Sequence, residues 1–243
     1  LEFGLFSPMD FFKAMEIWIQ ERGRRFLASS LGQGAQNAIV LAVFQAYERF
    51  KKRDAIFLIE EPEMFLHPQQ SRAFYDTLRS ISENNQVIYT THSSHFTSVP
   101  NFNEIRRVAK DAAQRTTVAQ TSLSDIEGKR DRLRQQLTQD RSELFFADHV
   151  VLVEGQTERT AFPEWARRIG VDLNRRNISI VEVGGKRSLP LFLDIVSSLQ
   201  ISVTVVFDTD TSDFGGNGEK ELEFNRSLTE RAGAGVRVNA PRL

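Results

Sequence analysis

Short runs of consecutive apolar residues, separated by longer amphipathic segments, constrain the fold of this 243-residue chain more than any other feature. In the first half, such runs occupy residues 54–59 and 86–91. In the second half they occupy residues 149–154, 177–183 and 202–208. Their length favours buried strands over helices, and the segments between them are long enough for crossover helices. The sequence therefore predicts an α/β fold with parallel strands in both halves.

The other elements are predicted from weaker patterns. Apolar residues near helical spacing predict a helix over residues 10–22, with Gly23 as its end. A glycine-rich turn at residues 29–36, SSLGQGAQ, leads into a second helix at residues 37–50. Residues 104–120 predict two short strands around a polar turn.

The alternation of strands and helices stops once and then restarts, which indicates two domains. We expect the first domain at residues 1–112 and the second, an α/β domain, at residues 141–243. Residues 113–140 are charged, rich in glutamine and helical in tendency, so we expect them to include a helical connector. The chain begins in what reads as the middle of a fold, and we therefore expect it to be part of a longer protein.

Composition excludes several classes of protein. The chain is 40% hydrophobic and 26% charged, which is typical of a soluble globular protein. No apolar run approaches the ~18 residues that would span a bilayer, and the absence of cysteine excludes disulfides and thiolate zinc sites. We therefore expect a cytoplasmic protein, not bound to a membrane, in which carboxylates hold any metal. Because the formal net charge is −1, a DNA-binding site has to be a local patch.

The segment IFLIEEPEMFLHP, residues 56–68, ends an apolar run with two adjacent acids. At the end of a strand, Glu60 can hold Mg²⁺ through water, and Glu61 can act as the catalytic base that orients a hydrolytic water. Solvated acids that end a strand are the common alternative. The pair by itself does not decide between these readings.

Two neighbouring segments favour a nucleotide site. The glycine-rich turn places Gly34 at the start of a helix, where free N–H groups attract phosphate. His92 follows the next strand, where a histidine can contact a γ-phosphate. An ordinary helix start and a packing histidine are the alternatives for these two residues.

In order and spacing, residues 28–100 resemble the C-terminal half of an ATP-binding-cassette (ABC) ATPase: signature loop, Walker B with catalytic glutamate, D-loop and switch histidine. The EEPEMFLHP stretch is similar to the IEEPE-x-x-LHP variant found in the overcoming lysogenization defect (OLD) nucleases. The resemblance implies that Gly34, Glu60, Glu61 and His92 contact ATP in the full-length protein. The chain departs from the family pattern in that Glu60 replaces the usual Walker B aspartate and the signature is not LSGGQ.

No G-x-x-x-x-G-K-[ST] phosphate loop occurs in the chain. The nearest segment, VGGKRS at residues 183–188, lacks the first glycine, since Ile180 stands in its place. The part of an ATPase that grips the nucleotide is therefore missing from this sequence, and we expect no ATP hydrolysis by the chain alone.

A second group of acids follows the strands of the second half. Glu154 ends one apolar run, Glu158 lies in the first turn of the next helix, and Asp208 and Asp210 follow a later run. Because parallel strands end at one edge of a sheet, and alternate residues of an extended segment face one way, we expect the four carboxylates to converge. Oxygen ligands of this kind suit Mg²⁺, Mn²⁺ or Ca²⁺. Helix-capping acids and a solvated D-x-D loop are the alternatives.

An E-G after one strand and a D-x-D after a later one resemble the Toprim domain, a parallel-sheet, Rossmann-like fold of topoisomerases, primases and several nucleases. The stretch VEVGGKRSL resembles the Toprim glycine turn, which implies that Gly184, Gly185 and Lys186 approach the site. An ATPase followed by Toprim is the domain order of the OLD family, which includes nuclease subunits of some anti-phage defence systems. The resemblance implies a DNA endonuclease that nicks or cleaves both strands, regulated by its ATPase domain. It also implies a homodimer, and it raises a helicase as a further partner.

For such an enzyme we expect hydrolysis with two Mg²⁺ or Mn²⁺ ions, ~4 Å apart. Glu154, Asp208 and Asp210 would form the main metal site, and Glu158 would assist a second ion. Cations also explain the cluster energetically, because carboxylates packed together without them repel one another. Lys186 would offset charge on the scissile phosphate.

Two other functions remain open. A topoisomerase- or primase-like transferase also uses Toprim, but a topoisomerase needs a tyrosine nucleophile, and Tyr47, Tyr75 and Tyr89 all lie in the first half. The second alternative is a DNA-binding ATPase scaffold without catalysis. Retained DNA binding without cleavage in any divalent cation would select the scaffold.

Overall fold

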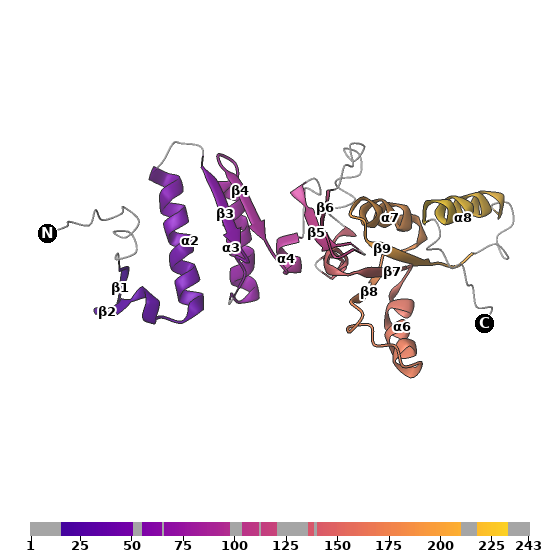
Figure 1. Ribbon diagram of the computed structural model, residues 1–243, viewed down its shortest axis with the longest axis horizontal. Coiled ribbons are helices and arrows are strands. Elements are labelled where there is room, and N and C mark those ends of the chain that lie inside the picture. Colours follow the sequence, from indigo (N-terminus) through magenta and orange to yellow (C-terminus); the bar gives the residue numbers. More distant parts are fainter. Residues whose placement is uncertain are drawn as a thin grey trace. The chain divides into compact units, whose positions relative to one another are not determined.

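The computed structural model describes residues 16–50, 55–64, 66–97, 104–111, 113–120, 136–138, 140–209 and 218–232 (Figure 1). The chain divides into two compact units, residues 1–96 and 97–243. The domain bounds expected from the sequence, which differ from this division, stay predictions.

The first unit opens with a hairpin in which β1 (Trp18–Glu21) pairs antiparallel with β2 (Arg24–Leu27). Arg22 and Gly23 join the strands with φ angles of 46° and 77°. Two consecutive positive φ angles are the mark of a type I′ turn, whose twist suits a tight hairpin. The helix predicted over residues 10–22 is therefore wrong at Trp18–Glu21, which form a strand. So short an apolar pattern fits both the helical and the strand period, and pairing with β2 gives the strand. The part of that prediction before residue 16 lies outside the described residues.

The rest of the first unit contains the predicted strand–helix–strand element. After the 3₁₀ turn η1 (Ala28–Ser30) come α2 (Gln33–Phe50), β3 (Ile56–Glu60), α3 (Pro68–Ile81), β4 (Gln86–Thr90) and α4 (Ser94–Thr97). β3 and β4 pair in parallel, with Glu60 opposite Thr90, which confirms the predicted βαβ unit. α2 begins four residues before its predicted start, and α3 begins at Pro68, where the missing N–H of proline costs nothing.

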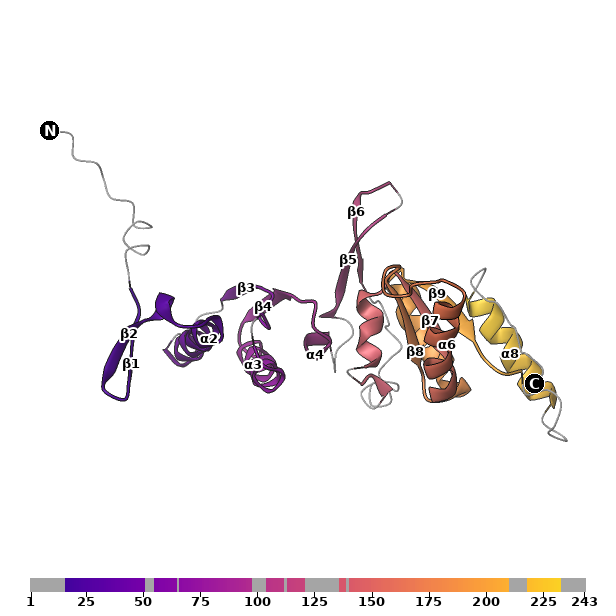
Figure 2. The same cartoon turned by 90° about the horizontal axis from the view of Figure 1, so that it is seen from below.

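The two faces of the β3–β4 pair differ. Figure 2 shows α2 and α3 on the same face, where Phe57 meets Phe44 of α2 and Ile59 packs on the α3 core. The opposite face carries Ile56 and Leu58, which are 66% and 74% exposed. The run at residues 54–59 forms the expected strand, but it is buried on one face only, because the described helices α2 and α3 lie on the same face.

The second unit combines a hairpin with a three-stranded parallel sheet. β5 (Arg106–Lys110) and β6 (Thr116–Gln120) form the hairpin, which confirms the two strands expected there. Most of the expected connector, residues 121–135, lies outside the described residues. After η3 (Arg141–Phe146) come β7 (His149–Val153), α6 (Gln156–Arg168), β8 (Ile178–Glu182), η4 (Lys186–Ser188), α7 (Leu189–Ser198), β9 (Ser202–Val206) and α8 (Gly218–Ala232).

The sheet order β8–β7–β9 is parallel throughout and confirms the predicted α/β alternation (Figure 1). β7 is the central strand, and Val150 and Leu152 on it are completely buried. α7 adds a continuous apolar face that includes Phe192 and Ile195. Burying each such side chain contributes roughly 1.5–3 kcal/mol, so this core holds the strand ends at a defined edge.

α8 had no counterpart among the expected elements. Phe224 and Leu228, four residues apart, pack on the core of the second unit and were the available signal in a segment rich in glycine and charge. Among the helices that the structure describes, none has the length and apolar character that a bilayer crossing requires.

Candidate functional site

The carboxyl ends of β7, β8 and β9 lie side by side at one edge of the second sheet. Val153 is in register with Glu182 on one side and with Val206 on the other. Glu154 therefore follows the central strand, and Asp208 follows the neighbouring strand two residues beyond its end. This is the edge at which we predicted the acids to meet.

Glu154 and Asp208 are in direct contact. The backbone N–H of Asp208 donates to Glu154 Oε1 over 2.8 Å, across a sequence separation of 54 residues. The contact fixes one carboxylate against the backbone that carries the other. The roles of both residues as metal ligands stay predictions.

Glu158 lies in the first turn of α6, next to Glu154. Its Oε2 accepts a hydrogen bond from the backbone N–H of Gly155 over 3.2 Å. A carboxylate at a helix N-terminus is also favoured by the helix dipole. The local sequence E-G-x-x-E thus places two of the predicted carboxylates at the same end of α6.

The fourth predicted ligand, Asp210, lies outside the described residues. Within the described ranges, no three histidine, aspartate or glutamate side chains are grouped closely enough to hold a metal ion. Glu154, Glu158 and Asp208 nevertheless offer only carboxylate oxygens, and this chemistry fits Mg²⁺ or Mn²⁺.

The glycine turn after β8 approaches the same edge. Gly184 and Gly185 have φ angles of 74° and 108°, a region that costs other residues roughly 1–2 kcal/mol. The N–H of Gly185 donates to the carbonyl oxygen of Glu154 over 2.8 Å. A Cβ added to Gly184 would lie 3.0 Å from the Arg141 guanidinium, so space also restricts this position. Both glycines are therefore needed to bring the turn against Glu154.

Lys186 follows this turn and is buried. Its ammonium donates to the carbonyl oxygen of Asp208 and lies 2.9 Å from Glu221 Oε1. It also lies 5.4 Å from the ring centre of Phe207. The hydrogen bond from Lys186 is the main reason that the pKa of Glu221 is lowered, and the positive charges of Lys186 and Arg187 lower it further. Glu221 is therefore ionised at neutral pH.

Three residues near this edge were not anticipated from the sequence. On α8, Glu221 binds Lys186, and Asn225 Nδ2 donates to the carbonyl oxygen of Thr209 over 2.7 Å. Arg141 Nη2 lies 2.9 Å from Glu182 Oε1, beside the glycine turn. The i, i+4 spacing of Glu221 and Asn225 becomes a signal only once α8 is known to be helical.

The first unit brings two of its predicted residues together at the β3 and β4 strand ends. Glu61 has a positive φ of 41°, and its N–H donates to the carbonyl oxygen of Thr90 over 3.0 Å. This turn leaves Glu61 Oε1 3.6 Å from His92 Nε2, and the histidine side chain is exposed. Glu60 is exposed at the end of β3.

Glu63, the last acid of EEPE, was not singled out from the sequence. Its Oε1 accepts hydrogen bonds from the Thr91 hydroxyl and from the N–H of His92, the latter over 3.0 Å. Its Oε2 is buried without a hydrogen-bond partner in the described part of the chain. Glu63 therefore anchors the loop that carries His92. The motif spacing gave no hint of this, because it does not reveal which acid turns inward.

The glycine-rich segment starts α2 as predicted. Gly34 lies in the first turn of the helix, and Gln36 Nε2 donates back to the carbonyl oxygen of Leu31 over 2.7 Å. The backbone N–H groups of Ala35 and Gln36 already donate to the carbonyl oxygen of Gly32. The role of Gly34 in nucleotide binding stays a prediction.

Family models and curated proteins were compared with the chain. A model described as "Overcoming lysogenization defect protein-like, TOPRIM domain" matches residues 145–210, and a model described as "AAA ATPase domain" matches residues 5–97. The first match contains Glu154, Glu158, Asp208 and Asp210, and the second contains Glu60, Glu61 and His92.

Three relatives carry nuclease names. The OLD nuclease of Thermus scotoductus (strain ATCC 700910 / SA-01) is 31% identical over 237 residues, which cover 95% of this chain and 45% of that protein. The Old nuclease of Escherichia phage P2 is 30% identical over 197 residues, covering 75% of this chain and 33% of that protein. Endonuclease GajA of Bacillus cereus (strain HuB5-5) is 26% identical over 186 residues, covering 66% of this chain and 27% of that protein.

The chain spans less than half the length of each of these relatives. Its similarity to the Thermus protein nevertheless extends through both units. From this similarity and from the order of the two matched domains, the chain belongs to the overcoming lysogenization defect family, in which it represents part of an ATPase domain followed by a Toprim domain.

Proposed function

We propose that this chain is the catalytic part of a metal-dependent DNA endonuclease, which hydrolyses phosphodiester bonds at the β8–β7–β9 edge. The observation that carries the proposal is the 2.8 Å contact between Glu154 Oε1 and the N–H of Asp208. It joins two acids that the sequence places on separate strands and that lie within the matched Toprim segment. The names of the relatives, two nucleases and an endonuclease, support this reaction class.

The proposed roles follow from position. Glu154, Asp208 and Asp210 hold the main divalent cation, Mg²⁺ or Mn²⁺, and Ca²⁺ has the ligand preference to take its place. Glu158, kept at the start of α6 by Gly155, assists a second cation. Such ions, when bound, activate a water for attack and stabilise charge on the leaving oxygen. The chain's own residues orient the carboxylates and fix their spacing.

Lys186 has a different environment from the one we predicted for it. We expected its charge to face the scissile phosphate, yet its buried ammonium contacts Glu221 and the Asp208 carbonyl. We therefore propose that Lys186 holds the backbone at Asp208 through its hydrogen bond, and we rank this role above contact with the scissile phosphate.

For the first unit we propose an ATP-facing edge in the full-length protein. Glu60 lies on the metal side, Glu61 is the base for ATP hydrolysis, and His92 and Gly34 contact phosphates. The 3.6 Å separation of Glu61 and His92 supports this arrangement. We also propose DNA as the substrate, a homodimer as the assembly, a helicase as a further partner and the cytoplasm as the location.

The test is a plasmid-nicking assay on the full-length protein in Mg²⁺ or Mn²⁺. Asp208→Asn keeps the shape of the side chain, and we expect cleavage to fall at least about 100-fold because a ligand charge is lost. Asp172→Asn is the matched control: Asp172 is exposed in a loop before β8 and accepts the N–H of Arg175, so activity should be retained.

Undiminished cleavage by folded Asp208→Asn would reject the assignment. Relaxed topoisomers without nicked product would favour the topoisomerase-like alternative. DNA binding without cleavage in any divalent cation would favour the scaffold.

A further inference from the structure

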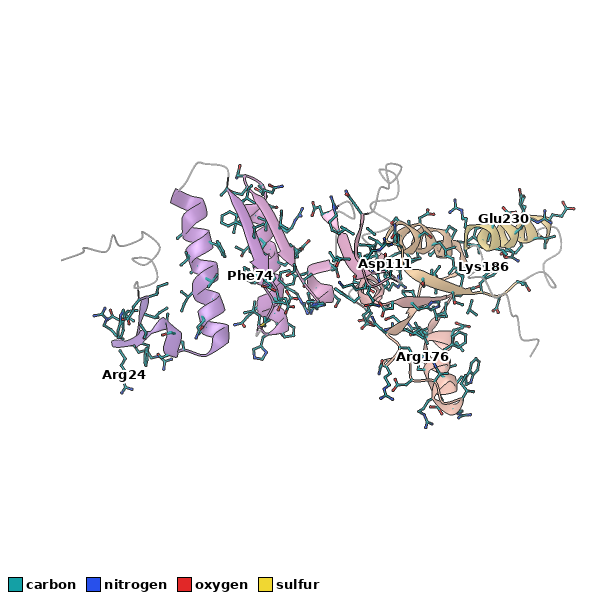
Figure 3. All side chains as sticks on the ribbon, in the orientation of Figure 1. Arg24, Phe74, Asp111, Arg176, Lys186 and Glu230 are labelled. Atoms are coloured by element: carbon teal, nitrogen blue, oxygen red, sulfur yellow. The ribbon has the colours of Figure 1, made fainter. Side chains whose placement is uncertain are left out.

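The backbone around Asp208 is held by groups from three different elements. Glu154, after β7, accepts from the N–H of Asp208. Lys186, from η4 and labelled in Figure 3, donates to the carbonyl oxygen of Asp208. Asn225, from α8, donates to the carbonyl oxygen of Thr209. Three backbone groups of Asp208 and Thr209 are therefore held in place. Backbone held in this way restricts the directions that the Asp208 carboxylate can take.

Asn225 holds this loop from an interior position. Its side chain is 8% exposed, and its Nδ2 must face Thr209 because a carbonyl oxygen only accepts. The amide Oδ1 is buried without a hydrogen-bond partner among the described residues. The described contact that accounts for a polar side chain at this buried position is the hydrogen bond to Thr209.

The charge of Lys186 is balanced by α8. Glu221, one turn before Asn225 on the same face of the helix, lies 2.9 Å from the Lys186 ammonium, and it also binds Arg187. An unpaired ammonium beside the Asp208 carbonyl would repel a cation bound at Asp208. The ionised Glu221 cancels much of this repulsion while Lys186 keeps its hydrogen bond to the loop.

We infer that Asn225 is a positioning residue. Together with the Lys186–Glu221 pair, it orients the backbone of Asp208 and Thr209 and thereby sets the affinity of the site for the divalent cation. This inference rests on the proposed metal site at Glu154 and Asp208. Asn225 acts through the backbone of Thr209, to which it donates. α8 lies beyond the matched Toprim segment, which ends at residue 210, and thus adds a component to the site.

The experiment measures Mn²⁺ binding directly, by the electron paramagnetic resonance signal of free Mn²⁺, in the full-length protein. Asn225→Leu removes the donor at similar volume. Groups that orient metal ligands are typically worth 10–100-fold in metal affinity, so we expect about tenfold weaker Mn²⁺ binding. The Mn²⁺ concentration for half-maximal nicking should rise by the same factor, and the rate at saturating Mn²⁺ should change less than about threefold.

Arg226→Gln is the matched control on α8, because Arg226 is exposed and adjacent in sequence. Its Mn²⁺ affinity should equal that of the unmodified protein. Asn225→Ala, which leaves room for a water at the Thr209 carbonyl, replaces Asn225→Leu if the latter does not fold. Glu221→Gln tests the charge balance, and we expect a smaller loss of Mn²⁺ affinity, about threefold.

Unchanged Mn²⁺ affinity in a folded Asn225 variant would overturn the inference, as would an unmodified protein that binds no Mn²⁺. A lowered melting temperature with unchanged affinity would assign Asn225 a structural role only and would overturn it too. If the unmodified protein binds Mn²⁺ but cleaves no DNA, the endonuclease proposal fails, and weaker Mn²⁺ binding by Asn225→Leu still supports the positioning role.

Discussion

The two strands that are followed by the predicted acids differ in how deeply their side chains are buried. Glu154 follows β7, a central strand whose Leu152 is fully buried. Glu61 follows β3, whose Ile56 and Leu58 are 66% and 74% exposed. In parallel sheets helices usually cover both faces, and the described helices α2 and α3 of the first unit cover one face of β3 and β4. Within the described residues, a similar sequence pattern therefore gives a more deeply buried strand in the second unit than in the first.

The loops next to these acids are each held by a carboxylate, and the second loop is also held by donors to its carbonyl oxygens. In the first unit, the carboxylate of Glu63 accepts from the Thr91 hydroxyl and the His92 N–H. In the second unit, Lys186 and Asn225 donate to the carbonyl oxygens of Asp208 and Thr209. The donors in the second unit hold the backbone of the loop without adding further negative charge beside Glu154 and Asp208.

The largest expected difference between the units concerns strand burial. Leu152→Ala should lower the free energy of unfolding by roughly 2–5 kcal/mol, because it empties a filled core position. Leu58→Ala should cost less than about 0.5 kcal/mol in this chain, since its side chain is exposed. Trp18 and Trp165 are the two tryptophans and lie in different units. Urea unfolding followed by fluorescence gives both values, with Trp18→Phe to isolate the signal of the second unit for Leu152→Ala and Trp165→Phe to isolate that of the first unit for Leu58→Ala. Equal losses would contradict the comparison.

A smaller difference is expected between the ion pairs beside the two sites. Arg141 and Glu182 lie 2.9 Å apart and are largely buried, so Arg141→Met removes a hydrogen bond between charged groups and should cost roughly 1.5–3 kcal/mol. His92 is exposed and 3.6 Å from Glu61, so His92→Gln should cost less than about 0.5 kcal/mol. The same urea titrations measure both. A cost for Arg141→Met as small as that for His92→Gln would show that Gly184 and its turn are held without this pair.

The smallest expected effect is on pH dependence. Burial lowers the pKa of His149, whose Nε2 lies 2.9 Å from the Thr204 hydroxyl between β7 and β9. The unfolded chain therefore binds a proton more readily than the folded one. Stability of the second unit should be complete above the unfolded pKa of about 6.5 and should fall as pH drops below it. The change should be smaller than that caused by Arg141→Met.

Thermal unfolding of the Trp18→Phe chain at pH 7.5 and 5.5 measures this dependence, and His149→Gln should flatten it. If the His149→Gln chain loses as much stability over this pH range as its parent, another group is responsible.

Local patterns were sufficient for most of the architecture. The apolar runs at residues 56–60 and 149–153 form parallel strands because their length and their place between helical segments leave few alternatives. The contact between Glu154 and the backbone N–H of Asp208 agrees with the same topology, since parallel strands end at one edge, while the convergence of the four carboxylates stays a prediction. Where the pattern was too short, as at Trp18–Glu21, the predicted helix was wrong, because pairing with β2 decided the conformation.

What the sequence by itself determined is the set of acids and the strands that carry them, because spacing, apolar run length and parallel topology are local or nearly local properties. Only the tertiary structure decided which groups aim those acids. Glu63, Asn225 and the Lys186–Glu221 pair act across long sequence separations, from positions where burial and direction are unknown until the units fold. The physical reason is that a hydrogen bond depends on distance and angle between two elements, and neither is encoded in the spacing of either element alone.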